Sequence, residues 1–244
     1  MRSVFKIWRT LGLSFRSWAR NFVPFMVLAL LIYAPVFIWI TVYDPAQAGS
    51  VGELRDKLFL WPTYLLSGLA TLLAPMLTYR VIQGLSGAKV PMRTSVRLGL
   101  RGIVPAITVA IMSTLLGRVP GGGLLAAVLG CIWFVAAPAA VAEQLGPWAA
   151  FARSSELTRG RRWGIFGLNF VIGLVVIGLL ALWILPLFHG PLIGLVDLKR
   201  RAYLFLATAG VVQLFVGITA AVSYALLRQD KEGISHEALA RVFE

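Results

Sequence analysis

Charged residues are scarce in this chain, and acidic ones are the scarcest. Its 244 residues include 10 Asp and Glu against 23 Lys and Arg, and charged residues make up only 14%. A soluble domain carries about 25% charged residues. Hydrophobic residues reach 59%, and the mean hydropathy is +0.82. So few charges cannot cover a water-facing surface, so most of the exterior is expected to face lipid.

Residues that carry metal and acid–base chemistry are also few. The single cysteine, Cys131, excludes an internal disulfide, and with only two histidines no Cys/His set has metal-ligand spacing. No phosphate-binding loop, nucleophile elbow, HExxH motif or paired-carboxylate pattern is present. We therefore predict no catalytic residue, no cofactor and no metal, and a protein that is not an enzyme.

What the chain does contain is six long apolar runs. They predict an all-α integral membrane protein of about six transmembrane helices, in a single polytopic domain over 1–244. In this prediction an interfacial helix covers 1–21, a helical bundle 22–227 and a cytoplasmic tail 228–244. The runs cover 22–43, 58–82, 102–117, 124–142, 164–188 and 203–227. The first run exceeds the length of a signal peptide's apolar core and is interpreted as an uncleaved anchor.

Short basic segments precede the odd-numbered runs. Residues 2–20 form an amphipathic pattern, with cations and no acid on one side and an apolar face on the other: Val4, Trp8, Leu11, Phe15 and Trp18. Such a helix lies in the membrane interface. A second short interfacial helix is predicted over 147–159, begun by Pro147 and ended by Gly160. Basic elbow segments that end at Arg20, Arg101 and Arg162 form a weak internal repeat, which a general bias of cations toward one side also explains.

The distribution of Lys and Arg sets the predicted orientation. With both termini in the cytoplasm, 17 of these residues lie inside and 6 outside, as the positive-inside rule requires. The prediction is a multi-pass protein of the bacterial inner membrane, N-in and C-in. Lys199, Arg200 and Arg201 are the discordant outer cluster. The formal net charge of +13 then points to anionic headgroups as partners and not to nucleic acid.

Candidate functional residues lie at the cytoplasmic ends of the runs. Charges inside the runs are nearly absent, which weighs against an ion-coupled transporter or an intramembrane hydrolase. Five residues remain as candidate structural or headgroup contacts: Arg80, Arg101, Glu143, Arg153 and Arg162. Glu143 either pairs with Arg80, Arg101 or Arg153, or is a solvated helix end.

Prolines and polar or small residues within the runs are the remaining features. Pro35, Pro75 and Pro138 each remove a backbone donor and predict a helix kink, which serves either packing or a substrate path. Asn169 and Gln213 are each expected to bond a neighbouring helix. Small residues share one face in the fourth and sixth runs, and they favour close helix packing within or between chains: Ala126, Gly130, Ala137, Gly210, Gly217 and Ala221.

Two stretches resemble a known family. Residues 138–166, with Glu143 and the segments 153–160 and 162–166, are similar to a motif of small bacterial inner-membrane proteins. These proteins are related to the membrane domain of some glycerophosphodiester phosphodiesterases. Residues 224–228 with 231–233 resemble the same group's C-terminal pattern. The family's catalytic barrel is absent here, so the resemblance implies a six-helix membrane unit with elbow helices and no phosphodiesterase activity.

Two hypotheses follow from the sequence. The first is a non-enzymatic scaffold, accessory subunit or regulator of a membrane or envelope complex, with a membrane protein as partner. The alternative is a transporter or lipid-handling protein that uses the proline-kinked helices and a basic cytoplasmic rim.

The predicted orientation is tested with reporter fusions after Asp44, Ala88, Gly122 and Glu244. We expect cytoplasmic reporter signals after Ala88 and Glu244 and periplasmic signals after the other two. A periplasmic signal at Glu244 contradicts the even number of spans.

Overall fold

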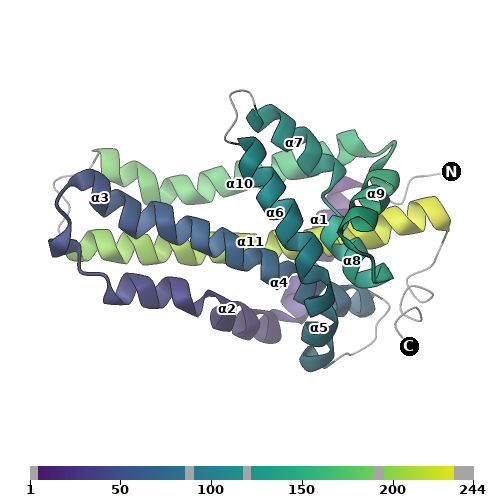
Figure 1. Cartoon of the computed structure of the whole chain (residues 1–244), viewed down its shortest axis with the longest axis horizontal. Coiled ribbons are helices and arrows are strands. Elements are labelled where there is room, and N and C mark those ends of the chain that lie inside the picture. The colour runs from purple at the N-terminus through teal and green to yellow at the C-terminus, as the bar shows by residue number, and fades with distance from the viewer. Residues whose placement is uncertain (1–4, 86–90, 118–121, 190–194, 234–244) are drawn as a thin grey trace.

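The computed structural model describes residues 5–85, 91–117, 122–189 and 195–233 (Figure 1). Every regular element within these ranges is helical, as the sequence predicts. The elements are α1 (Ile7–Arg20), α2 (Phe22–Val42), η1 (Pro45–Gln47), α3 (Val51–Arg55), η2 (Asp56–Leu60), α4 (Trp61–Leu85), α5 (Met92–Gly99), η3 (Leu100–Gly102), α6 (Ile103–Gly117), α7 (Gly122–Ile132), α8 (Ala136–Glu143), α9 (Pro147–Thr158), α10 (Arg162–His189) and α11 (Leu195–Glu232).

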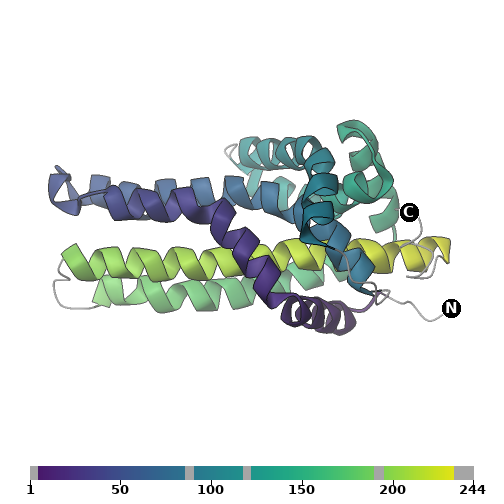
Figure 2. The same cartoon turned by 90° about the horizontal axis from the view of Figure 1, so that it is seen from below.

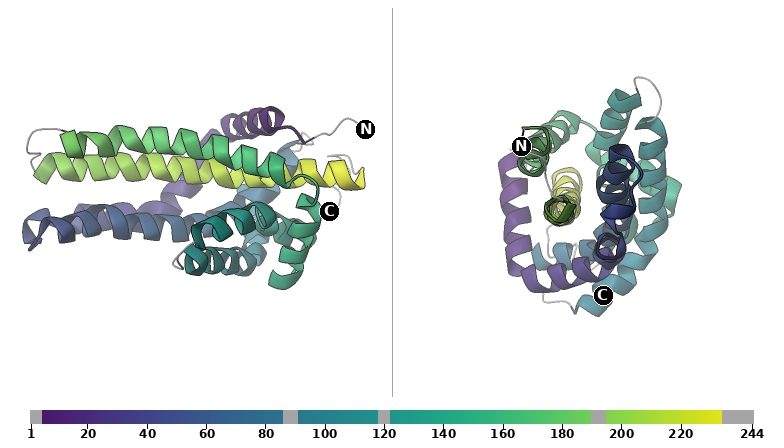
Figure 3. Two further views of the ribbon diagram at one scale, coloured as in Figure 1. Left: turned by 90° about the horizontal axis from the view of Figure 1, so that it is seen from above. Right: turned by 90° about the vertical axis from the view of Figure 1, so that its left-hand side faces the viewer.

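Helix α11 lies at the centre of the bundle, and the end-on view in Figure 3 shows other helices around it. It is the longest helix, with 38 residues, and it packs against α4, α1, α10 and α2. Its glycines allow this, since a Cβ on Gly210 would lie 3.3 Å from the Tyr33 ring and one on Gly217 would lie 3.1 Å from Ala74. Lipid supplies no hydrophobic drive for helix association, so close backbone approach holds such helices together. The small face of the sixth run therefore packs within the chain.

The chain is a membrane protein. Four helical stretches among the described residues are long and apolar enough to cross a bilayer: Phe22–Val42, Gly52–Leu85, Arg162–Trp183 and Asp197–Glu232. A fifth candidate exists if the helical stretch Ala127–Glu143 and α9, which meet at a bend of 119°, count as one broken span. Helix α6 has 15 residues, about 22 Å at 1.5 Å per residue, and α7 is shorter still. The count of six spans therefore stays a prediction.

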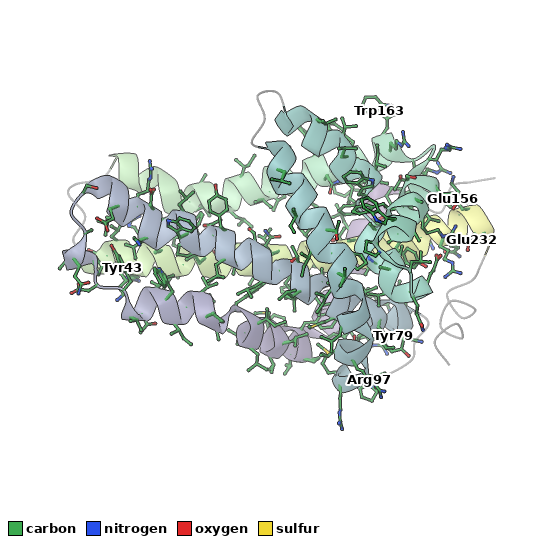
Figure 4. All side chains as sticks on the ribbon, viewed as in Figure 1. Tyr43, Tyr79, Arg97, Glu156, Trp163 and Glu232 are labelled. Atoms are coloured by element: carbon green, nitrogen blue, oxygen red, sulfur yellow. The ribbon has the colours of Figure 1, made fainter. Side chains whose placement is uncertain are left out.

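Exposed aromatic side chains lie near both ends of the long axis. We name these the α9 end, where α1, α5, α9 and the last turns of α11 lie, and the α3 end, where η1 and α3 lie (Figure 1). Figure 4 places Trp163 at the first and Tyr43 at the second. Exposed Trp and Tyr residues at the two ends are Trp8, Trp148 and Trp163, and Trp39, Trp61 and Tyr64. Paired aromatic belts are typical of proteins that cross a membrane.

Helix α1 runs across the bundle and not along it, as Figures 2 and 3 show. It buries a small polar face made of Thr10, Ser14 and Ser17 and packs mainly against α11. The rings of Trp8 and Phe15, on the predicted apolar face, are 76% and 59% exposed. The described residues leave these two rings uncovered, which fits the predicted interfacial helix, while Leu11 and Trp18 of the same face pack against the core. The first residues of the helix predicted over 2–20, including Val4, lie outside the described residues.

A serine from α5 enters the backbone ladder of α4 just after Pro75. The Ser95 hydroxyl donates to the Met76 carbonyl at 2.5 Å and accepts from the Arg80 N–H at 3.2 Å. These are the two groups that an uninterrupted α-helix would pair with each other. The approach is close because Gly99 lies against the α4 backbone, where a Cβ would come within 3.0 Å of Met76. Figure 1 shows α5 against this end of α4.

The fourth run is interrupted at 133–135, between α7 and α8. Pro138 lies three residues into α8, where its ring excludes a normal bond to the carbonyl of Phe134. At the break the Ala136 N–H donates to the Trp133 carbonyl at 2.9 Å. The Ile132 carbonyl, which would otherwise accept that N–H, accepts from the Ser154 hydroxyl at 2.8 Å and the Thr158 hydroxyl at 3.3 Å. Both donors belong to α9, which begins at Pro147 and is followed by Gly160 at φ +81°. The short helix predicted over 147–159 is therefore present, while its position at a membrane interface stays a prediction.

A lysine of the discordant outer cluster closes the end of α2. Lys199 Nζ donates to the carbonyls of Thr41 and Tyr43 at 2.9 and 3.0 Å. The Tyr203 and Thr41 hydroxyls are 2.5 Å apart beside them. Cations near a helix C-terminus satisfy carbonyls that the helix leaves unpaired. Lys199 therefore has a structural role at the α3 end, whatever the orientation of the chain.

Replacing Gly99 with Ala tests the close contact between α4 and α5. We expect the free energy of unfolding in detergent to fall by about 1–3 kcal/mol, the usual range for overpacking. Gly68→Ala in α4 is the control, because a Cβ there meets no atom within 4 Å, and its effect is expected to stay under about 1 kcal/mol. Equal stability of the two variants contradicts the contact.

Candidate functional site

Charged side chains from three helices meet at the α9 end. We name this group the ion cluster: Glu143, Arg153, Glu156, Tyr224, Arg228 and Glu232. Glu143 ends α8, the next two residues lie on α9, and the last three lie on α11. Figure 4 shows Glu156 and Glu232 close together at this end.

Glu143 is the innermost carboxylate of the ion cluster. Arg153 Nε donates to its two oxygens at 3.0 and 2.9 Å, and the Tyr224 hydroxyl donates to Oε1 at 2.8 Å. Arg228 Nε lies 3.9 Å away. Of the three arginines that the sequence offered as partners, the structure pairs Glu143 with Arg153.

Arg153 binds three carboxylates at once. Besides Glu143, its guanidinium donates to Glu156 at 3.0 Å and to Glu232. Burial lowers the pKa of Arg153, but hydrogen bonds to Glu232, Glu143 and Glu156 raise it more, so the net shift is upward. The side chain is only 19% exposed. Arg153 is therefore a structural cation, and lipid headgroups have little access to it.

The α11 members of the ion cluster repeat every four residues. Tyr224, Arg228 and Glu232 share one helix face, where Arg228 donates to Glu232 at 2.7 Å and to the Tyr224 hydroxyl at 3.1 Å. The sequence prediction placed 228–244 in a tail, but α11 continues to Glu232. Sequence reasoning missed these residues as site members, although their spacing is a readable signal for one helix face.

The ion cluster joins helices and has no free group for acid–base chemistry. Each of its carboxylates accepts from at least one arginine, and Lys231 donates to the Glu156 backbone carbonyl at 2.9 Å. One turn away, Asp230 accepts from the Phe5 N–H at 3.0 Å and lies 3.6 Å from Arg161. These contacts fix the N-terminal segment, α9 and α11 to one another.

Arg80 and Arg162 lie outside this cluster. Arg80 Nε donates to the Asn21 side-chain oxygen at 2.8 Å, at the junction of α1 and α2. Arg162 is exposed at the start of α10 and is the member of the set best placed to reach headgroups. The side chain of Arg101 lies outside the described ones.

The three prolines lie apart. Pro35 is exposed within α2, a helix that changes direction along its length in Figure 2. Pro75 is buried in α4 against Gly102, and Pro138 is buried in α8. Pro138 lines one cavity of the apolar groove described next, and neither Pro35 nor Pro75 lines that groove.

An apolar groove runs beside α7, and we name it the α7 groove. It consists of two cavities of about 510 and 250 Å³ that share Gly130 and Phe134. The larger lies between α7 and α10, and the smaller lies among α4, α6, α8 and α11. Asn169 donates weakly to Cys131 Sγ at 4.0 Å, and Gln213 has no hydrogen-bond partner among the described residues. The small face of the fourth run therefore opens into this groove at Gly130 and Ala137.

No protein-family model, curated protein or solved structure matches the chain. The resemblance to the membrane domain of glycerophosphodiester phosphodiesterases therefore stays a prediction.

Replacing Arg153 with Met tests the ion cluster. Three carboxylates would lose a partner in a partly buried place, and we expect unfolding in detergent to become easier by about 2–4 kcal/mol, somewhat below the figure for fully buried pairs. Arg162→Met makes the same chemical change at an exposed position and should cost about 0.5 kcal/mol or less. If both variants unfold alike, the cluster does not hold the helices together.

Proposed function

We propose that the protein is a non-enzymatic scaffold or accessory subunit that receives a transmembrane helix of a partner protein in the α7 groove. The observation that carries the proposal is the composition of the groove. Its lining includes many small residues, which let two helix backbones approach: Ala106, Ala127, Gly130, Ala137, Gly173 and Gly217. Membrane helix interfaces are enriched in such residues.

The exposure of α10 supports this proposal. In its most apolar window 18% of residues are buried, against 50% in the helix containing α4 and 56% in α11. Helix α10 packs against α11 and more sparsely against α7 and α1. A helix with so little cover has room for one more neighbour.

The amide groups of the groove support a helical partner as well. Gln213 lines the smaller cavity and Asn169 the larger, and polar side chains at such positions bond across helix pairs. Neither cavity is lined by an ionisable group other than Cys131. This lining suits an apolar helix better than a hydrated solute, so it favours the scaffold over a transporter.

The location in the bacterial inner membrane, with both termini in the cytoplasm, is part of the proposal. It is supported by basic segments that gather at the α9 end, on α1, α5 and the residues after α9. A second function, lipid handling, is supported by the apolar lining, which would also accept an acyl chain. The experiment below separates the two.

Filling the groove should remove the partner without harming the fold. A Cβ on Gly173 meets no atom within 4 Å, so Gly173→Leu projects into the groove and not into the core. We expect this variant to lose proteins that co-purify with the wild type in mild detergent. Gly178→Leu on the same helix is the matched control, since Gly178 also has open space and does not line the groove. Equal co-purification with both variants contradicts the proposal.

The single cysteine allows a direct readout of the same prediction. Cys131 lines the larger cavity, so a photo-crosslinker attached there in native membranes should capture a protein of discrete mass. The control carries Cys131→Ala and Val27→Cys, with the label on an exposed position of α2. Capture of lipid alone at Cys131 would support the lipid-handling function instead.

A further inference from the structure

A third cavity, at the α9 end, differs from the two of the groove in its chemistry. It has a volume of about 170 Å³ and lies between the last turns of α1 and the C-terminal end of α4. We name it the α1–α4 pocket. Its lining combines two arginines and two small polar residues with three others: Arg16, Arg20, Ser17, Asn21, Leu13, Gly84 and Leu85.

The Ser17 hydroxyl in the wall of this pocket has no hydrogen-bond partner among the residues that the structure describes. Ser17 is 9% exposed, and its Oγ is buried with no hydrogen bond. Helical serines commonly bond the carbonyl four residues earlier, as Ser14 does with Thr10 at 2.8 Å. A buried polar atom without a partner is unfavourable, so an unpaired hydroxyl beside a cavity marks a place for a ligand atom.

The neighbouring Asn21 is held by two hydrogen bonds of its own, one of them to an arginine of α4. Its amide nitrogen donates to the Ser17 carbonyl at 3.0 Å, and its oxygen accepts from Arg80 Nε at 2.8 Å. Asn21 therefore holds the turn between α1 and α2 in place and leaves the ligand contacts to Ser17, Arg16 and Arg20.

The electrostatic balance of the pocket selects an anion. The sequence contains no Asp or Glu before Asp44 and none between Asp56 and Glu143, so neither α1 nor α4 places a carboxylate here. The C-terminal ends of these helices oppose an anion with a partial charge of about half an electron each. Two full positive charges, on Arg16 and Arg20, exceed that opposition.

The surroundings of the pocket point to a lipid. The exposed rings of Trp8 and Phe15 on α1 and the exposed Phe22 and Val23 at the start of α2 place this turn at the depth of headgroups. Leu13 and Leu85 line the same cavity. An anion that enters with apolar chains attached would satisfy both kinds of lining.

We propose that the α1–α4 pocket binds the phosphate of an anionic glycerophospholipid, through Arg16, Arg20 and the Ser17 hydroxyl. Arginines recognise phosphate oxygens through charge-assisted hydrogen bonds, and the hydroxyl supplies one further donor. This site is independent of the proposed scaffold function, since the pocket shares no residue with the α7 groove.

The test is lipid binding to the full chain in phosphatidylcholine nanodiscs that contain one quarter phosphatidylglycerol, followed by native mass spectrometry. We expect one retained phosphatidylglycerol per chain. The variant Arg16→Gln with Arg20→Gln should weaken its retention by about tenfold or more, and Ser17→Ala by about threefold to tenfold. Because the hydroxyl has no internal partner, Ser17→Ala should not lower thermal stability.

The matched control is Arg93→Gln with Arg97→Gln on α5. These arginines have the same spacing and are exposed, so the change in net charge is identical. We expect retention within about twofold of the wild type, since a dispersed surface charge contributes only weak attraction. Equal loss in both double variants overturns the proposal, because it shows attraction without a site.

Two further arms distinguish the source of the phosphate and guard against misfolding. Inorganic phosphate that displaces the lipid at millimolar concentration would overturn the lipid assignment. Gly84→Leu fills the pocket where a Cβ meets no atom within 4 Å, and it should release the lipid while the protein stays folded. Retention of the lipid in a folded Gly84→Leu variant would also overturn the proposal.

Discussion

The constraint on which this structure depends is that lipid offers no hydrogen bonds to the backbone. Each place where a helix ends or breaks therefore needs a donor or acceptor from elsewhere in the protein. Ser95 supplies it beside Pro75, Ser154 and Thr158 supply it at Ile132, and Lys199 supplies it at the end of α2. Because these side chains come from other helices, the repair of each break also fixes how two helices pack.

The lipid surroundings also explain the ion cluster. A bundle without a hydrophobic drive between its helices gains order from close packing and from polar contacts, and here the two are separated along the long axis. Glycines of α11 approach α2 and α4, while arginines and carboxylates join α8, α9 and the last turns of α11. The cluster thus defines one end of the molecule, and the functional surfaces lie beside it.

The position of every long helix was readable from the sequence, because apolar runs of this length fold as helices in a bilayer. Pro147 and Gly160 also located α9. The partner of Glu143 was not readable, since all three candidate arginines lay near predicted cytoplasmic ends of the apolar runs and only packing decides among them. Nor did the sequence show that Arg228 and Glu232 extend the helix that contains Tyr224, because a mixed-charge segment after an apolar run looks like a tail. The α1–α4 pocket was not readable either, because the sequence does not show that Ser17 of α1 lies beside the end of α4.

The short α6 and α7 have a consequence for the membrane itself. About 22 Å of helix is less than the ~30 Å thickness of a hydrocarbon layer, and neither α6 nor α7 reaches the α3 end in Figure 1. Lipid next to this hairpin has to thin, or the hairpin has to stay within one leaflet. Either outcome makes the bilayer uneven around the protein. Such hydrophobic mismatch would attract neighbours with equally short helices and so sort them toward this side.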